Sequence, residues 1–399
     1  MIKWVSNTLQ KSDCAGLALM EPDVVKRIRE FHRSFPQYAP TPLVSLDRLA
    51  ESLGIGGIYL KDESYRFGLN SFKALGCTFA IASYIAQVLG KSVWELDYSS
   101  LPAAASELGE FTFYAATDGN HGRAVAWAAR ELGQRAVVYM NKGCSEVRLR
   151  HILNEGAEAS ISELNYDDTI RFVRGLASAS PNSEIIQDTA WEGYEDIPGW
   201  IMQGYAVMAL EACEQLEQVG VVPTHVSLQA GVGAFAGSAQ AFVSNFYGDM
   251  VPKSFVVEPH VADCYYRSAL RGDGEVVNVG GEMRTIMAGL ACGEPSPVSW
   301  DIMKSKSDYF ASIDDADAAR AMRVLGAPLE GDTRVISGES GASGMGFLLG
   351  LLTNDDLADL RADAGVGKDS HFLVFSTEGD TDPQNYRDIV WNGKFGIQY

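Results

Sequence analysis

The chain has 399 residues, of which 46% are hydrophobic and 21% charged, and its 52 acidic and 32 basic side chains give a formal net charge of −20. This composition is that of an ordinary globular protein and argues against disorder, collagen or coiled coil, and the length implies two or three domains or one large two-layered domain. A large acidic excess without a block of lysines and arginines is a poor match to nucleic acid or to an anionic membrane, so we expect neither as a partner.

The N-terminal segment carries no apolar run typical of a secretion signal, and no stretch of eighteen apolar residues suggests a membrane span. The cysteines at 14, 77, 144, 213, 264 and 292 include no pair spaced for zinc. We therefore expect a cytoplasmic protein without a metal. The spacing leaves open whether Cys264 and Cys292 pair.

Short apolar runs alternate along the chain with segments of helical period. Strands are expected at 112–117, 136–140, 225–229, 254–258 and 372–376, and helices at 120–132, 145–153, 233–246 and 262–270. Strands separated by such helices form βαβ units, so the sequence predicts an α/β fold with a mostly parallel sheet. We expect a smaller domain over 85–199 and a larger, discontinuous domain over 1–84 and 200–399.

Ligands bind such sheets outside the carboxyl ends of the strands, so the residues that follow each strand are candidate site residues. The first in chain order is Lys73, in the sequence Ser71-Phe72-Lys73, where Asn70 or Ser71 would cap a helix. The positive end of the helix dipole disfavours an ammonium there, so we expect a lowered pKa for Lys73, which favours a Schiff-base nucleophile. An ordinary solvated lysine is the alternative.

The sequence TDGNHG (117–122) follows the strand at 112–117 and opens a helix. Gly119 allows a tight turn, and Asn120 can present its amide to a ligand beside the helix N-terminus. Asp118 could equally be a helix cap. A second acid, Asp188, follows the apolar run EIIQ (184–187).

Two further strand ends carry candidate residues. The sequence GVGAFAG (231–237) follows the strand at 225–229, and its small residues would let backbone amides converge on a phosphate. The last strand leads into STEGDTDP (376–383), where hydroxyl groups could face a ring nitrogen or a carboxylate. Turn chemistry alone would explain the same letters.

The sequence RVISGESGA (334–342) suggests a different enzyme class. A strand followed by G-x-S-x-[GA] is the nucleophile-elbow pattern of α/β-hydrolases, with Ser340 as the nucleophile. Asp363 and His371 follow in the order that a triad requires. This reading leaves the elements around Lys73 and Asn120 unexplained, so the hydrolase is a distant alternative.

Four features occur in the order found in fold-type-II pyridoxal-phosphate enzymes. They are the lysine, the turn with the asparagine, the glycine loop, and the serine and threonine at the end of the last strand. The chain resembles that superfamily from about Thr41 to Asp382, and longer strings such as QDTAWEGYEDIPGWIMQGY and TIMAGLACGEPS resemble the diaminopropionate ammonia-lyases. The resemblance implies two open, twisted, mostly parallel sheets with helices on both faces, in a large and a small domain. It also implies a homodimer.

The same resemblance assigns roles to residues. Lys73 would carry pyridoxal 5'-phosphate as a Schiff base, Asn120 would face the ring 3-hydroxyl, and Ser376, with Thr377, would meet the pyridine nitrogen. The remaining cofactor contacts would come from Phe72, Gly231, Val232, Gly233, Ala234 and Phe235. Substrate contacts would come from Ser71, Thr117, Asp118, Gly119, His121 and Asp188.

The implied reaction is α,β-elimination of 2,3-diaminopropionate, the L and also the D isomer, to pyruvate and two ammonia. Lys73 would take the Cα proton of the L isomer and Asp118 that of the D isomer, while Asp188 would orient the substrate amines. Serine and threonine dehydratases usually have a small residue where Asp118 stands, and they are the nearest alternative. A non-catalytic amino-acid-binding protein would lack Lys73 or the glycine loop.

Overall fold

The computed structural model describes residues 1–9 and 11–396. Its strands are β1 (Lys3–Ser6), β2 (Leu43–Ser45), β3 (Gly57–Asp62), β4 (Thr112–Thr117), β5 (Arg135–Met140), β6 (Glu158–Ile161), β7 (Ser183–Ile185), β8 (His225–Gln229), β9 (Lys253–Pro259), β10 (Tyr309–Ile313) and β11 (His371–Ser376). Its helices are α1 (Ala15–Leu19), α2 (Pro22–Arg33), α3 (Asp47–Leu53), α4 (Lys73–Val88), α5 (Leu101–Glu107), α6 (Asn120–Glu131), α7 (Glu146–Asn154), α8 (Tyr166–Ala179), α9 (Asp196–Gln218), α10 (Ala234–Tyr247), α11 (Cys264–Arg271), α12 (Pro297–Lys306), α13 (Asp315–Gly326), α14 (Ser343–Thr353), α15 (Ala358–Ala364) and α16 (Pro383–Val390).

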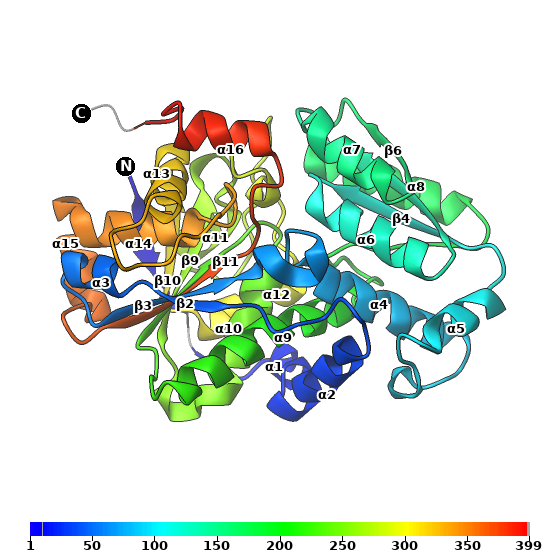
Figure 1. The fold of residues 1–399 in the computed structure, drawn as a ribbon, viewed down its shortest axis with the longest axis horizontal. Coiled ribbons are helices and arrows are strands. Elements are labelled where there is room, and N and C mark those ends of the chain that lie inside the picture. The colour runs from blue at the N-terminus through cyan, green and yellow to red at the C-terminus, as the bar shows by residue number, and fades with distance from the viewer. Residues whose placement is uncertain (10, 397–399) are drawn as a thin grey trace.

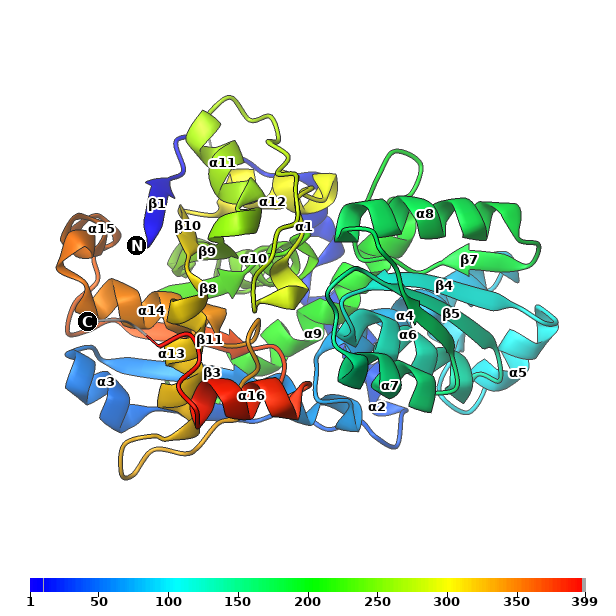
Figure 2. The same ribbon diagram turned by 90° about the horizontal axis from the view of Figure 1, so that it is seen from above.

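The strands form two sheets that lie side by side (Figure 1). The larger has the order β1-β10-β9-β8-β11-β3-β2, with five parallel central strands and antiparallel strands β1 and β2 at its edges. The smaller has the order β6-β5-β4-β7 and is entirely parallel. Helices cover both faces of each sheet, as the view from above shows (Figure 2). The predicted α/β fold with two mostly parallel sheets is confirmed.

The apolar runs of the sequence become the central strands because both faces of a parallel sheet are buried. Every residue of β8 is buried, including its polar members. The run at 334–336 behaves differently, since residues 333–338 have no regular structure and Ser340 lies in a turn before α14. Without a strand before Ser340 there is no nucleophile elbow, and that part of the hydrolase alternative is wrong.

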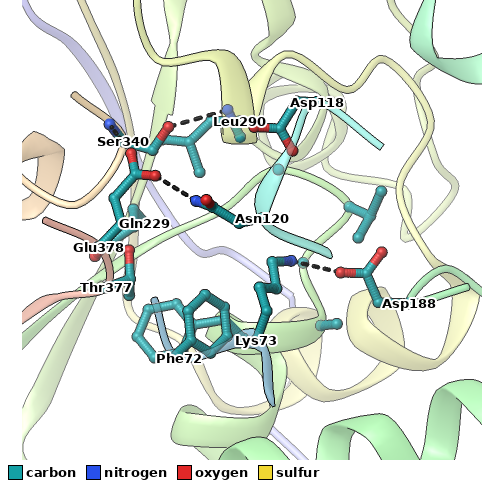
Figure 3. Close-up of a pocket in the computed structure, with 16 residues that line it drawn as sticks. Phe72, Lys73, Asp118, Asn120, Asp188, Gln229, Leu290, Ser340, Thr377 and Glu378 are labelled. Atoms are coloured by element: carbon teal, nitrogen blue, oxygen red, sulfur yellow. Dashed lines mark hydrogen bonds and ion pairs between the residues drawn. The ribbon is translucent and has the colours of Figure 1, made fainter. Parts of the chain in front are cut away.

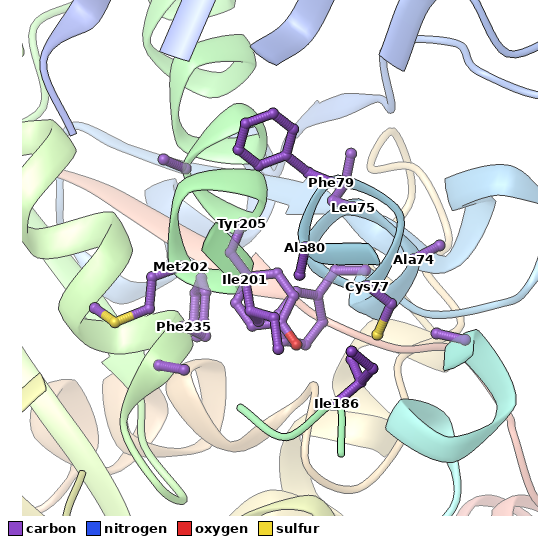
Figure 4. Close-up of a cluster of buried hydrophobic side chains, with 14 of the residues drawn as sticks. Ala74, Leu75, Cys77, Phe79, Ala80, Ile186, Ile201, Met202, Tyr205 and Phe235 are labelled. Atoms are coloured by element: carbon purple, nitrogen blue, oxygen red, sulfur yellow. The ribbon is translucent and has the colours of Figure 1, made fainter. Parts of the chain in front are cut away.

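Helices α4 and α9 join the two halves of the molecule and cross at two glycines. A Cβ at Gly76 would lie 2.5 Å from the ring of Tyr205, and a Cβ at Gly204 would overlap the carbonyl oxygen of Leu75. Around this crossing, α4 packs in a buried apolar cluster with α9 and α10 (Figure 4). The close approach fixes the first turn of α4, which begins with Lys73.

The strands of the smaller sheet all lie within the predicted small domain of residues 85–199. The proposed limits at 84/85 and 199/200, however, fall inside α4 and α9. The assignment of domain limits therefore stays a prediction. Among the described residues, no helix combines the length and the apolar character needed to cross a bilayer.

Candidate active site

The candidate active site is a pocket at the carboxyl ends of strands from both sheets. It is lined by residues that follow β3, β4, β7, β8 and β11, together with the turns at 289–290 and 340 (Figure 3). The lining residues are Phe72, Lys73, Asp118, Asn120, Asp188, Gln229, Gly231, Val232, Gly233, Ala234, Phe235, Gly289, Leu290, Ser340, Thr377 and Glu378. The pocket thus gathers candidates that lie more than 300 residues apart in sequence.

Lys73 and Asp188 form an ion pair at the floor of this pocket (Figure 3). The Lys73 Nζ lies 2.6 Å from Asp188 Oδ2, and the Asp188 side chain is 1% exposed. The other carboxylate oxygen, Oδ1, is buried without a hydrogen-bond partner among the described residues. One oxygen of Asp188 thus has unused hydrogen-bonding capacity.

This pairing reverses the prediction for Lys73. Burial lowers the pKa of Lys73, but the adjacent Asp188 carboxylate raises it, and the net shift is upward. Burial raises the pKa of Asp188, and the Lys73 ammonium more than offsets this and lowers it to about 2. The helix cap also differs from the prediction, because Phe72 takes the N-cap position and the Ser71 hydroxyl accepts a hydrogen bond from Lys73 N at 3.4 Å.

Asp118, on the opposite wall, has a cationic partner that the sequence did not suggest. Arg148 Nη1, from α7, lies 3.3 Å from Asp118 Oδ2, and the guanidinium is almost fully buried. Both candidate acids therefore face a basic side chain. Asp118 is neutralised by arginine and Asp188 by lysine.

Asn120 lines the pocket and is held by another unpredicted residue, Glu378. The Asn120 side-chain amide donates to Glu378 Oε2 (Figure 3). Glu378 is 2% exposed, and its Oε1 accepts a hydrogen bond from Ser340 N at 3.0 Å. This carboxylate fixes the asparagine amide at the edge of the pocket.

The glycine loop has the geometry of an anion site. Gly233 has φ 93°, a left-handed conformation that favours glycine, and a Cβ there would overlap the hydroxyl of Tyr265. A Cβ at Gly231 would lie 2.8 Å from the carbonyl oxygen of Gly289. The loop opens α10, whose first N–H groups have no partner within the helix, so the chain offers backbone donors and a positive dipole end.

Of the two hydroxyls at the end of β11, only that of Thr377 lines the pocket. Ser376 Oγ instead lies 2.7 Å from Ser337 Oγ and 3.3 Å from the carbonyl oxygen of Glu378. The assignment of Ser376 to the site is corrected on this geometry, because successive side chains of a strand point to opposite faces. Gln229 Nε2 donates to Thr377 Oγ1 at 3.2 Å, which leaves the Thr377 hydroxyl free to donate.

Four predicted substrate contacts stand behind the pocket wall and outside its lining. Thr117 Oγ1 accepts the N–H groups of Gly119 at 2.8 Å and Gly122 at 3.0 Å, so it shapes the turn. His121 Nε2 lies 2.7 Å from the carbonyl oxygen of Ile186, and its ring is buried. Gly119 and Ser71 likewise contribute backbone geometry. These residues support the pocket from behind.

The structure also separates the members of the hydrolase triad. Ser340 Oγ accepts a hydrogen bond from Gly289 N at 3.0 Å, and Asp363 accepts one from the Tyr309 hydroxyl. His371 is the first residue of β11, whereas the pocket lies beyond the last, about 16 Å along a strand of this length. The hydrolase alternative is wrong.

The two cysteines whose pairing was open, Cys264 and Cys292, are both thiols here. Cys264 Sγ contacts the carbonyl oxygen of Cys292 at 3.7 Å. Both side chains are buried, and neither lines the pocket.

Several pocket residues carried no role in the sequence analysis. Glu378 directly follows the two hydroxyls considered there, and a carboxylate at a strand end was a signal for it. Gln229 ends β8 and could have been found in the same way. Arg148, Gly289 and Leu290 gave no local signal, because they reach the site only through tertiary contacts.

The residues present fit pyridoxal phosphate. Lys73 supplies an amine, and the loop at 231–235, where a Cβ at Gly231 or Gly233 would clash, supplies a phosphate cradle. Phe72, Asn120 and Thr377 line the same pocket. This set combines an amine, an anion site and a hydroxyl in one crevice, which is what that cofactor needs.

Comparison with known proteins agrees with this geometry. Residues 35–361 match the family model described as pyridoxal-phosphate dependent enzyme. Diaminopropionate ammonia-lyase of Escherichia coli strain K12 is 49% identical over 379 residues, which cover 95% of this chain and 94% of the relative.

Two crystal structures of diaminopropionate ammonia lyase from Escherichia coli superpose closely on the chain. The complex with D-serine has a TM-score of 0.93, and that with the aminoacrylate-PLP azomethine reaction intermediate has one of 0.92. Each is 45% identical and covers 100% of this chain and 99% of the other. The pocket and these likenesses together show that the chain belongs to the pyridoxal-phosphate-dependent enzymes, within the family of diaminopropionate ammonia-lyases.

Proposed function

We propose that this chain catalyses the α,β-elimination of 2,3-diaminopropionate, with release of pyruvate and two ammonia. The observation that carries the proposal is the Lys73–Asp188 pair, 2.6 Å long, in the same pocket as the loop at 231–235. An amine beside a buried acid, next to an anion site, suits an amino-acid substrate with a second ammonium. The diaminopropionate ammonia-lyases supply the matching substrate class.

The chain's own residues would hold pyridoxal phosphate at both ends. The backbone of residues 231–235 would bind its phosphate, Lys73 Nζ its carbonyl carbon, and Thr377 its ring nitrogen. When bound, the cofactor delocalises the electron pair that proton loss leaves on Cα. Because a hydroxyl such as that of Thr377 is too weak an acid to protonate the ring nitrogen, this site favours expulsion of a β leaving group.

Lys73 Nζ would take the Cα proton of the L isomer, since it is the amine nearest the cofactor position. Asp188 would hold the substrate ammonium through Oδ1, the buried oxygen that has no partner within the described residues. The ammonium must be bound while charged and then leave as ammonia, and a fixed carboxylate serves the first of these steps. The remaining aminoacrylate hydrolyses to pyruvate and the second ammonia.

Asp118 would take the Cα proton of the D isomer. It lies on the pocket wall formed by the end of β4, whereas Asp188 follows β7 (Figure 3). The E. coli relative binds D-serine, which supports access of D-configured amino acids to such a pocket. Two bases on different walls would let one enzyme process both isomers.

A kinetic panel tests this function. Purified enzyme loaded with pyridoxal phosphate is assayed with L- and D-diaminopropionate, serine and threonine, and release of 2-oxo acid is followed. We expect diaminopropionate to have the highest kcat/KM, because only its β-group is an ammonium that Asp188 can bind. A higher kcat/KM for serine or threonine would favour the dehydratase alternative and contradict the proposed substrate.

We also propose that the enzyme works as a homodimer in the cytoplasm. The six cysteines are free thiols in the structure, as suits a reducing compartment. Light scattering coupled to gel filtration should give twice the 43.2 kDa chain mass, and a monomer would contradict the dimer. Cell fractionation tests the location.

A further inference from the structure

Arg148 does not line the pocket but contacts Asp118, which does. It is the third residue of α7, and its side chain is 7% exposed. Its aliphatic stem packs on Gly119, where a Cβ would lie 3.0 Å from Arg148 Cδ. The guanidinium then extends to Asp118 Oδ2, 3.3 Å from Nη1. Gly119, which has no side chain, thus makes room for this arginine.

The same guanidinium also reaches the larger sheet. Arg148 Nη2 lies 3.5 Å from Glu339 Oε2, and Glu339 is in turn held by the side-chain amide of Asn385 in α16. Burial lowers the pKa of Arg148, but the carboxylates of Glu378, Glu339 and Asp118 raise it well above its ordinary value. Arg148 is therefore a permanent cation between one carboxylate of the smaller half and two of the larger.

A second contact parallels this one. Asn120, two residues after Asp118, donates to Glu378 at the end of β11. The turn of residues 118–120 is consequently tied to the larger half at two points, through Arg148 and Glu339 and through Asn120 and Glu378. Of these residues, Asp118 is the one whose proposed step needs an exact position relative to substrate.

We propose that Arg148 is a positioning residue that seats the Asp118 carboxylate for the D isomer by tying it to Glu339 across the cleft. The inference rests on the proposed function, in which Asp118 serves the D isomer and Lys73 the L isomer. A buried ion pair that served only stability would affect both isomers alike. An ion pair that positions only one of two bases changes the ratio of kcat/KM for the D isomer to kcat/KM for the L isomer.

Arg148→Met is the direct test, because methionine keeps much of the apolar stem over Gly119 and removes the charge and the donors. A small misplacement of a reacting group can cost up to about a hundredfold in rate. We expect kcat/KM for D-diaminopropionate to fall about tenfold or more and that for the L isomer to fall less than about threefold. The cofactor absorbance should stay that of the wild-type enzyme.

Glu339→Gln gives an independent test if the first variant folds poorly. Glutamine can still accept the hydrogen bond from Asn385 and loses only the charge that faces Arg148. We expect a change of the D-to-L ratio in the same direction, about threefold, because Arg148 keeps its contact with Asp118.

Arg171→Met is the matched control. Arg171, on α8, pairs with Glu294 across the same two halves, but both side chains are about half exposed and neither lines the pocket. Loss of this ion pair should leave the D-to-L ratio of kcat/KM unchanged.

The outcomes separate the two claims. If the wild-type enzyme releases no pyruvate from either isomer, the proposed function is wrong. If the wild type acts on both isomers and Arg148→Met and Glu339→Gln leave their ratio unchanged, the function stands and the role of Arg148 is overturned. An equal fall of the D-to-L ratio of kcat/KM in Arg171→Met would also overturn the role of Arg148, because loss of any ion pair between the two halves would then have the same effect.

Discussion

Each of the two pocket aspartates has its own cation, and the two cations differ in chemistry. Lys73 carries an amine that can exchange protons, whereas a guanidinium such as that of Arg148 stays charged at all accessible pH values. Asp188 is thus paired with a group that can lose its charge, and Asp118 with one that cannot. The two acids are therefore suited to different tasks.

Asp118→Asn tests this division of tasks. Asparagine keeps the size of the side chain and an acceptor for Arg148 but cannot act as a base. Because general-base catalysis contributes about a hundredfold or more, kcat/KM for D-diaminopropionate should fall by that amount. The L isomer should lose less than about tenfold. Full activity on the D isomer in steady-state assays would show that Asp118 is not the base.

Sequence reasoning located the residues that act through local pattern and missed those that act through distant contacts. Lys73, Asp118, Asn120 and Asp188 each follow a strand, and all four line the pocket. Arg148 contacts Glu339 only because two sheets meet, and no spacing in the sequence encodes that meeting. The raised pKa of Lys73 was missed for the same reason, since its cause lies 115 residues away.

At the scale of elements, the loop between β8 and α10 is the most constrained part of the site. Gly233 combines a left-handed backbone with a side-chain position already filled by Tyr265, whose hydroxyl donates to the carbonyl oxygen of Val232 at 2.6 Å. Any side chain there must displace the tyrosine or the loop.

Gly233→Ala should weaken cofactor binding. We expect the alanine to cost about 1–3 kcal/mol of loop strain, which corresponds to a loss of pyridoxal phosphate affinity of about fivefold to about 150-fold. Titration of the cofactor-free enzyme, followed by absorbance, measures the loss. Gly175→Ala is the control, since Gly175 lies inside α8 with open space around it, and an unchanged affinity in both variants would contradict the argument.

The elements themselves were largely predictable where an apolar run is buried on both faces. The strands expected at 112–117 and 225–229 match β4 and β8 to the residue. The run at 334–336 failed because apolar alternation also suits an extended segment that packs without strand partners. The prediction that Asn70 or Ser71 caps the helix was wrong, because Phe72 is the N-cap and Asn70, with a left-handed φ of 60°, extends the preceding turn.

At the scale of the whole molecule, one carboxyl group makes stability depend on pH. Asp167, on α8, accepts a hydrogen bond from Gly293 N at 3.1 Å, and thereby joins the smaller half to the segment before α12. Burial, with the nearby Glu294 carboxylate, raises the pKa of Asp167 to about 6. An acid whose pKa is higher in the folded than in the unfolded protein favours folding only while it is protonated.

Asp167→Asn should therefore stabilise the protein at neutral pH. The wild type loses this contribution to stability as pH rises from about 4 through about 6. Asparagine can keep the hydrogen bond from Gly293 N and does not ionise, so the variant loses no stability at this position over the same range. We expect a gain of about 1–3 kcal/mol above pH 7 that vanishes below about pH 4. Urea unfolding across this range measures it, with exposed Asp369→Asn as control, and a gain independent of pH would exclude titration of Asp167 as the cause.

The division of the strands between two sheets also sets the order in which the protein can form during synthesis. The smaller sheet is built from residues 112–185, so its strands are complete early. The larger sheet pairs Lys3 with Ser312 and Gly57 with His371, and such distant pairings form late. Because Thr377 and Glu378 follow β11, the pocket can form only after the chain has been synthesised past Glu378. Capture of the cofactor therefore has to wait until β11 has joined the larger sheet.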